Sequence, residues 1–353
     1  MTASDNFRFF STDCRPGERV FGYKTIGYMA ANTEMRVGYG IVRGERPGPV
    51  VVLISALHGW EPMGTEMIRR AVQAVDTAEL SGTIVSIPMA NAFSMEFGGT
   101  AESSGLQVSP ADSLNLNRVF PGKEKYGWGT EQLAYRLAGE ITRVADVVVD
   151  LHDGTSSNNM IPLCTFMACE EELGYPAGLT EATLELAKAM GTQVGRRRTG
   201  TPPGGSSLGS TCSARGIVSL VLSVGGLGMV DENVDEGVRC LQNVLKAKGM
   251  IEGEMAPPPF QVFCTNEQHQ VLYTSAGGFF FPAPAVGLGA VVEKDQPLGQ
   301  VIDPLTSEIR EVLTAPFKGV IGMFRERMVT NPGGMLGHLA STENYFWAAK
   351  LPS

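Results

Sequence analysis

Four apolar runs divide the first 255 residues of the chain. They are rich in β-branched side chains and almost continuous, as expected for strands that are buried on both faces of a largely parallel sheet. Segments with the helical spacing of apolar residues lie between them. The predicted strands are 50–57, 83–89, 145–151 and 217–224. This alternation of strand and helix predicts an α/β domain.

Three predicted helices account for much of the chain between and after these strands. The first has Pro62 near its first turn, where proline is tolerated. The second begins near Thr130, which we expect to cap it, and the third lies between Asp231 and Gly249. The apolar stripes are Met67, Ile68, Ala71, Val72 and Val75 in the first, Leu133, Leu137 and Ile141 in the second, and Leu241, Val244 and Leu245 in the third.

The pattern changes after residue 255. The segment 254–260, EMAPPPF, indicates a linker, and the chain beyond it consists of short β-rich stretches broken by turn residues. We therefore predict two domains, an α/β domain over 1–255 and a small all-β domain over 256–353. The second resembles a biotinyl/lipoyl-type barrel-sandwich, but its turn 303–308, DPLTSE, has no lysine to modify. A structural role is expected for it, and not that of a prosthetic-group carrier.

Composition narrows the class of protein. The formal net charge of −9 argues against nucleic acid or an anionic membrane as a partner. No run of about eighteen apolar residues and no secretory signal is visible, so we expect a soluble cytoplasmic protein. The six cysteines lack CxxC spacing and indicate reduced thiols. The basic run 196–198, RRR, is expected to be solvated.

Two of the four histidines stand at the ends of predicted strands. His58 follows the first apolar run and His152 the third, and ligands of open α/β sheets gather outside the carboxyl ends of the strands. Glu61 is close enough to join His58. Alone, a His-x-x-Glu pair is more often a surface feature, but the second histidine favours a metal site. Two imidazoles and one carboxylate with a free position suit zinc in hydrolysis.

A second motif, SPADSLNLNRVFPG at 109–122, supplies groups that recognise carboxylates. Arg118 offers a fork of donors suited to a substrate carboxylate, and Asn117 adds a directional amide. The alternative is that both residues only pin this Pro/Gly-rich loop to the domain.

Together, the motifs HGWE at 58–61, NLNRVFPG at 115–122 and DLH at 150–152 resemble those of the succinylglutamate desuccinylase/aspartoacylase family of zinc carboxypeptidase-like hydrolases. The likeness covers most of the chain. It implies a three-layer α/β domain with a mixed, largely parallel central sheet, followed by a β-domain. It also implies that His58, Glu61 and His152 bind one zinc ion, and that Asn117 and Arg118 hold the carboxylate of an N-acyl amino acid whose amide bond is hydrolysed.

The sequence departs from the family pattern at two positions. Ser223 stands where the family has the glutamate that acts as general base, and a hydroxyl needs its own activator. Gln107 stands where the family has an arginine suited to the oxyanion; it can donate a hydrogen bond but brings no charge. Asp153 either takes over proton transfer or caps the following turn. Asp150 suits either orientation of a histidine or a buried hydrogen bond.

Three hypotheses follow. The first is a zinc-dependent amidohydrolase with an atypical general base, acting on a small carboxylate-bearing molecule. The second keeps the zinc ion and the carboxylate-binding residues Asn117 and Arg118, but the protein performs an elimination or another non-amide reaction. The third is a catalytically silent binding protein, which the free position at the ligand set argues against. The segment 277–284, GGFFFPAP, suits either a homo-oligomer contact or core packing.

Overall fold

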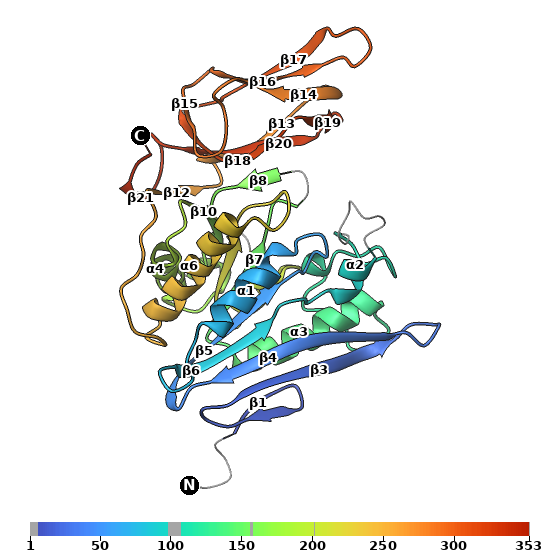
Figure 1. The fold of residues 1–353 in the computed structure, drawn as a ribbon, viewed down its shortest axis with the longest axis vertical. Coiled ribbons are helices and arrows are strands. Elements are labelled where there is room, and N and C mark those ends of the chain that lie inside the picture. The colour runs from blue at the N-terminus through green and yellow to red at the C-terminus, as the bar shows by residue number, and fades with distance from the viewer. Residues whose placement is uncertain (1–5, 98–106, 156–157, 201, 353) are drawn as a thin grey trace.

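The centre of the protein is a ten-stranded sheet, seen in the computed structural model, which describes residues 6–97, 107–155, 158–200 and 202–352 (Figure 1). Its strands, in spatial order, are β21 (Trp347–Lys350), β12 (Gln261–Thr265), β10 (Val194–Arg198), β9 (Leu163–Met167), β11 (Val218–Ser223), β7 (Val147–His152), β5 (Arg46–Ser55), β6 (Ser81–Ile87), β4 (Glu34–Arg43) and β3 (Arg19–Tyr28). The four strands predicted from the apolar runs are the neighbours β11, β7, β5 and β6. They pair in parallel, while β9 with β11 and β3 with β4 are antiparallel, so the mixed, largely parallel sheet is confirmed.

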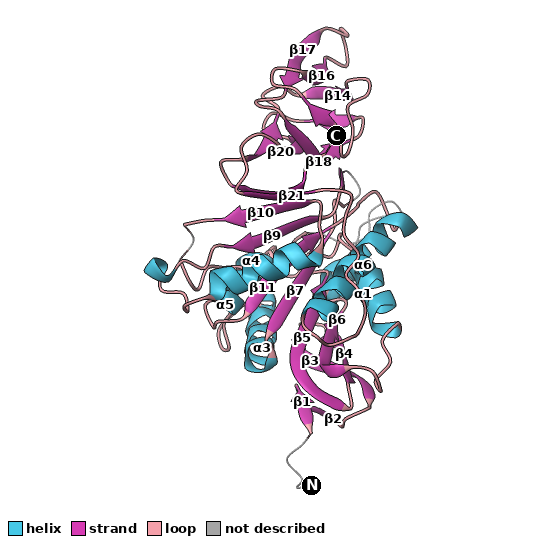
Figure 2. Ribbon diagram, turned by 90° about the vertical axis from the view of Figure 1, so that its left-hand side faces the viewer, coloured by secondary structure: helices cyan, strands magenta, loops and turns pink. Residues whose placement is uncertain are grey.

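Helices cover both faces of this sheet and complete the predicted three layers (Figure 2). One apolar core lies under α1 (Met63–Gln73), α4 (Leu179–Met190) and α6 (Asp231–Ala247). A second core lies under α3 (Gly129–Val144) and α5 (Leu208–Ser213). Shorter helical segments are α2 (Ala92–Glu96), η1 (Leu116–Arg118) and η2 (Glu171–Leu173). Strands buried on both faces explain why the four central runs are nearly continuous in apolar residues.

The three predicted helices are confirmed as α1, α3 and α6, with one correction at a helix start. Thr130 is not the cap of α3, because the helix already begins at Gly129. Instead, the Asp112 carboxylate accepts hydrogen bonds from the Thr130 backbone N–H at 2.9 Å and from its hydroxyl at 2.8 Å. A side chain from the preceding loop thus satisfies a free N–H group of the first turn.

The β-rich part contains two packed sheets, which confirms a small β-domain. One sheet has the order β13 (His269–Tyr273), β20 (Met335–Ser341), β18 (Gly319–Arg325) and β15 (Val291–Val292), with β8 (Asn158–Met160) also paired to β18. The other has the order β17 (Ile309–Thr314), β16 (Pro297–Ile302), β14 (Gly278–Pro282) and β19 (Met328–Thr330). Phe280, from the apolar segment 277–284, is fully buried in the core of this domain. A separate two-stranded sheet joins β1 (Phe7–Phe9) and β2 (Thr12–Cys14).

The two parts of the chain share strands across the predicted boundary at 255/256. After that boundary, β12 and β21 extend the central sheet instead of the β-domain. Before it, β8 joins the β-domain. Edge strands present unpaired backbone groups, and these exchanges supply partners for the edges of β10 and β18. Among the described residues, no helix has the length and apolarity needed to cross a membrane.

Candidate active site

The carboxyl ends of β5 and β7 meet because the two strands are parallel neighbours. His152 is the last residue of β7, and His58 lies three residues beyond β5. Between His58 and Glu61, Gly59 passes so close to another loop that a Cβ atom on it would lie 2.3 Å from the backbone carbonyl carbon of Ser94. Only glycine fits this path, so the turn that carries both side chains is held tightly in place.

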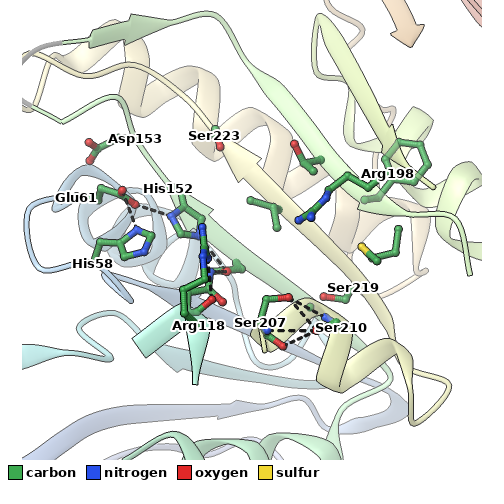
Figure 3. A pocket seen from close by; sticks show the side chains of 17 residues that line it. His58, Glu61, Arg118, His152, Asp153, Arg198, Ser207, Ser210, Ser219 and Ser223 are labelled. Atoms are coloured by element: carbon green, nitrogen blue, oxygen red, sulfur yellow. Dashed lines mark hydrogen bonds and ion pairs between the residues drawn. The ribbon is translucent and has the colours of Figure 1, made fainter. Parts of the chain in front are cut away.

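His58, Glu61 and His152 converge on one point, as the sequence predicts (Figure 3). The Nδ1 atom of His58 lies 2.9 Å from Glu61 Oε1, and the Nδ1 atom of His152 lies 2.5 Å from Glu61 Oε2. Their ligand atoms all lie within 4.8 Å of one another, and the three residues could hold a metal ion. All three come from the ends of rigid elements, because Glu61 lies two residues before α1.

The other ring nitrogen of each histidine contacts an oxygen acceptor. His152 Nε2 lies 3.0 Å from Asp150 Oδ2, a contact that fits both roles expected of Asp150, orientation of the histidine and a buried hydrogen bond. His58 Nε2 lies 3.2 Å from Asn115 Oδ1. Both oxygens can accept a hydrogen bond from a proton on Nε2, and that tautomer would leave Nδ1 free to face the common point. This is the usual environment of a metal-binding histidine. The contact of Asn115 was not predicted, although the residue opens the NLNR motif.

Charge complementarity sets the protonation of this cluster. Burial alone would raise the pKa of Glu61, but the charges and hydrogen bonds of His152 and His58 outweigh it and lower the pKa to about 2. Burial also opposes protonation of His152, but the carboxylates of Asp150 and Glu61 raise its pKa well above the ordinary value.

Asp153 follows the last of these histidines and has both carboxylate oxygens engaged. Its Oδ2 accepts a hydrogen bond from the backbone N–H of Met63 at 2.9 Å, and its Oδ1 accepts one from Thr155 at 2.7 Å. It therefore caps the following turn, as one of its two predicted roles required, and also binds the start of α1. Burial and the neighbouring Glu61 charge raise the pKa of Asp153 to about 6. Proton transfer by Asp153 stays a prediction.

One wall of the cavity beside the cluster is formed by β11. Ser219, Val221 and Ser223 alternate toward the cavity, while Leu220 and Leu222 face the core under α1, α4 and α6. Ser223 pairs with His152 in the β11–β7 register, so it lies beside the cluster of His58, Glu61 and His152. The cavity has a volume of about 290 Å³. Its lining consists of His58, Glu61, Asn117, Arg118, Asp150, His152, Asp153, Thr165, Phe166, Met167, Arg198, Ser207, Gly209, Ser210, Ser219, Val221 and Ser223.

Asn117 and Arg118 reach this cavity from η1. The Asn117 amide donates to Asp150 Oδ2 at 3.4 Å and its oxygen accepts from the Leu208 backbone N–H at 3.0 Å, so this residue does pin its loop to the domain. Arg118 lines the cavity and donates to the carbonyl oxygen of Asn117 at 2.7 Å. Its guanidinium has further donors for a ligand.

Residues 47–244 match the succinylglutamate desuccinylase/aspartoacylase catalytic domain. The chain belongs to this family. It is 26% identical over 303 residues to the N-alpha-acetyl-L-2,4-diaminobutyric acid deacetylase of Halomonas elongata, a match that covers 85% of this chain and 84% of the relative.

Solved structures of family members have the same fold. A succinylglutamate desuccinylase/aspartoacylase from Rhodobacter sphaeroides superposes with a TM-score of 0.79 at 22% identity and covers 96% of this chain and 100% of its own. The product-bound ectoine utilization protein EutE (DoeB) of Ruegeria pomeroyi gives a TM-score of 0.79 at 20% identity, with 92% and 95% coverage.

The positions of two residues in the structure differ from what the sequence predicted or add to it. Gln107 is exposed, and within the described part of the chain it is not among the residues that line the cavity. The structure therefore does not bring it together with His58, Glu61 and His152. The second observation concerns the basic run: Arg198 is exposed to solvent, as expected, but it also lies at the carboxyl end of β10 and lines the cavity (Figure 3). Its place at a strand end was the signal that could have found it.

Proposed function

We propose that this protein is a zinc-dependent hydrolase that cleaves the amide bond of a small carboxylate-bearing substrate, such as an N-acyl amino acid. The observation that carries the proposal is the convergence of His58 Nδ1, His152 Nδ1 and the Glu61 carboxylate beside a cavity that Arg118 also lines. The name of the Halomonas relative, a deacetylase, supports the same reaction class.

The donor set fits zinc. Two imidazole nitrogens and one carboxylate are a ligand set of catalytic zinc sites, and the cavity leaves room for a further ligand. The oxygens of Asp150 and Asn115 orient the two rings from outside. When bound, zinc lowers the pKa of a coordinated water to about 7 and polarises a carbonyl oxygen.

Recognition of the substrate falls to Arg118. Among the described residues that line the cavity, Arg118 and Arg198 are the arginines. Arg118 lies next to Asn117, which donates a hydrogen bond to Asp150, the partner of His152. A bidentate pair between this guanidinium and the substrate carboxylate would place the neighbouring amide bond beside the cluster.

Proton transfer requires a group other than Ser223. Hydrolysis adds water to the acyl carbon and breaks the C–N bond, while a proton moves from the water to the leaving nitrogen. We assign this transfer to Asp153. Of the three carboxylates in the cavity, Glu61 belongs to the ligand set and Asp150 bonds His152, whereas each Asp153 oxygen keeps a lone pair beyond its one backbone hydrogen bond.

The first test is metal content and product analysis. Purified protein is expected to carry about one zinc ion per chain, and to release acetate and a free amine from N-acetyl amino acids in the presence of zinc. Arg118→Ala should lower kcat/KM by a factor that corresponds to about 2–5 kcal/mol, because an arginine–carboxylate pair is removed. Arg118→Lys should not retain the wild-type kcat/KM. An unsaturated product in place of the amine would favour the elimination hypothesis, and absence of zinc would contradict the metal assignment.

The second test separates the two functions of Asp153. Asp153→Asn should lower kcat by about 10²–10⁴-fold, with KM nearly unchanged, but the loss of one backbone hydrogen bond could have the same effect. The double variant Asp153→Asn/Ser223→Glu resolves this, because a new carboxylate beside His152 restores proton transfer without restoring the turn. No recovery in the double variant, with zinc still bound, would argue for a structural function of Asp153.

A further inference from the structure

The segment that follows His152 connects the candidate active site to the β-domain. His152 ends β7, Asp153 comes directly after it, and Asn158 begins β8. This short strand pairs with β18 of the β-domain, and in their register Asn158 lies opposite Arg325 (Figure 1). One piece of chain therefore carries residues of the candidate active site and, a few positions later, a strand that belongs to the β-domain.

Backbone hydrogen bonds join this piece of chain to the loop after β11. Ser223 ends β11 and pairs with His152, so the two segments leave the central sheet side by side. Three hydrogen bonds connect them: from the N–H of Gly154 to the carbonyl of Gly225 at 3.0 Å, from Gly225 to Met160 at 2.8 Å, and from Leu227 to Thr155 at 2.7 Å. A displacement of one segment would therefore displace the other.

The backbone of Asn158 lies at the centre of these contacts. Its N–H donates to the carbonyl oxygen of Gly154 at 3.1 Å, which closes the turn after Asp153. A Cβ atom on Gly154 or on Gly226 would collide with the Asn158 carbonyl oxygen. Both glycines therefore pack directly on this backbone, and only glycine fits at these positions. Any shift of Asn158 is passed to the turn on one side and to the loop after β11 on the other.

The side chain of Asn158 is held from the β-domain. It is buried, and its amide oxygen accepts a hydrogen bond from Arg325 Nε at 2.7 Å. Arg325 is partly buried, and burial lowers the pKa of its guanidinium. Its Nη1 donates to the sulfur of Met328 at 2.9 Å, a weak acceptor, and no carboxylate pairs with it among the described residues. The Asn158 amide is thus the strong acceptor for this cation.

Stability of the β-domain alone does not account for this arginine. A buried charge loses its hydration, and its replacement by an apolar side chain of similar volume is often neutral or stabilising. The guanidinium is planar and rigid, however, so a hydrogen bond from it fixes the orientation of its acceptor. What Arg325 supplies here is a fixed position for Asn158.

We propose that Arg325 is a positioning residue for the candidate active site: through Asn158, it holds the turn that carries Asp153 against the loop that follows Ser223. This inference rests on the proposed function where it concerns catalysis, because Asp153 must lie within reach of the reacting groups. An error of about 1 Å in such a position can lower a rate by about 10²-fold.

The activity test compares Arg325→Met with the charge-matched control Arg327→Met, using zinc-loaded protein and N-acetyl-L-alanine. The Arg327 guanidinium lies over the ring of Phe281, 5.5 Å from its centroid, and this contact stays within the β-domain. Arg325→Met should lower kcat roughly 10- to 100-fold and change KM by less than about 2-fold. The control should keep the wild-type kcat. An unchanged kcat in Arg325→Met, or an equal loss in the control, would overturn the proposal.

Asn158→Ala tests whether Arg325 acts through Asn158. Both single variants remove the same contact, so their losses of kcat should not multiply in the double variant Asn158→Ala/Arg325→Met. Losses that multiply would mean that Arg325 acts independently of Asn158, which contradicts the proposal. Circular dichroism and zinc content check each variant. If Arg325→Met does not fold, Arg325→Lys takes its place, because lysine keeps the charge but lacks the planar fork.

Hydrogen exchange separates this inference from the proposed function, because it does not depend on any reaction. Arg325→Met should raise the exchange rate of peptides that carry the amides of Gly154, Gly225 and Leu227 by about 10-fold or more, while peptides of β16 and β17 stay unchanged. If N-acetyl amino acids are not hydrolysed by the wild-type protein, the proposed reaction fails, but this measurement still decides whether Arg325 holds the turn. Equal exchange in the wild-type and variant proteins would show that it does not.

Discussion

The four histidines of the chain form two pairs of similar geometry in different parts of the molecule. The rings of His58 and His152 have centroids 5.1 Å apart at the end of the central sheet. The rings of His269 and His338 have centroids 5.2 Å apart in the β-domain. Since residue type and separation are nearly equal, the surroundings alone separate a candidate metal site from core packing.

The difference lies in oxygen acceptors. In the first pair, Glu61, Asp150 and Asn115 contact all four ring nitrogens, and the pKa of His152 is raised despite burial. In the second pair, neither ring nitrogen of His269 has a partner among the described residues. There, burial and the positive charge of Arg196 lower the pKa of His338 to about 4, and burial lowers that of His269. In the described part of this protein, the histidine pair that a carboxylate joins has a donor set that could hold a metal ion.

The largest expected effect comes from removing one histidine of each pair. His152→Ala should abolish stoichiometric zinc binding and lower hydrolysis by roughly 10³-fold or more, because the metal supplies several kcal/mol of stabilisation to the transition state. His338→Leu should keep its zinc. Metal analysis of both purified variants checks this, and full zinc occupancy in His152→Ala would show that the ligand set is wrongly assigned.

A smaller effect should follow when only the charge behind the first pair is removed. Asp150→Asn keeps an oxygen that can accept from His152 Nε2 at the present 3.0 Å but removes the negative charge. Loss of such an outer partner usually weakens metal binding by about 10–100-fold. Competition with a chelator measures the affinity, and circular dichroism checks the fold. An unchanged affinity would mean that the charge of Asp150 does not act on the metal site.

The central strands and the convergence of His58, Glu61 and His152 were predictable because a local pattern determines them. Runs buried on both faces are almost continuously apolar, and a histidine at the end of each of two parallel strands identifies their common edge. In contrast, β3 and β4 were not predicted. The side chains of β3 alternate between exposed and partly buried positions, and such a strand has no continuous apolar run.

The place of Arg198 in the cavity lining was beyond prediction for another reason. Arg198 lies at the site because of the strand order β10–β9–β11. In this order β9 runs antiparallel to β11, and segments that are distant in the sequence lie side by side in the sheet. No local pattern reports that order. Likewise, β12 and β21 have sequences typical of the β-rich part but pair with the central sheet, because partner choice depends on which edge is free.

The smallest expected effect concerns the second histidine pair and the stability of the fold against pH. The pKa of His338 is about 4 in the folded protein, against about 6.5 for an ordinary histidine. Between these values the unfolded chain binds a proton that the folded protein does not, so the free energy of unfolding should fall as the pH falls from 6.5 to 4. The contribution of His338 is about 2–3 kcal/mol over that range. Urea unfolding of the wild-type protein and of His338→Leu at a series of pH values measures this contribution, together with the effect of the His338 charge on the neighbouring His269. The variant should lose less stability in acid than the wild-type protein. Parallel pH profiles would show that His338 does not titrate below its ordinary range, and the contrast between the two pairs would then rest on His269 alone.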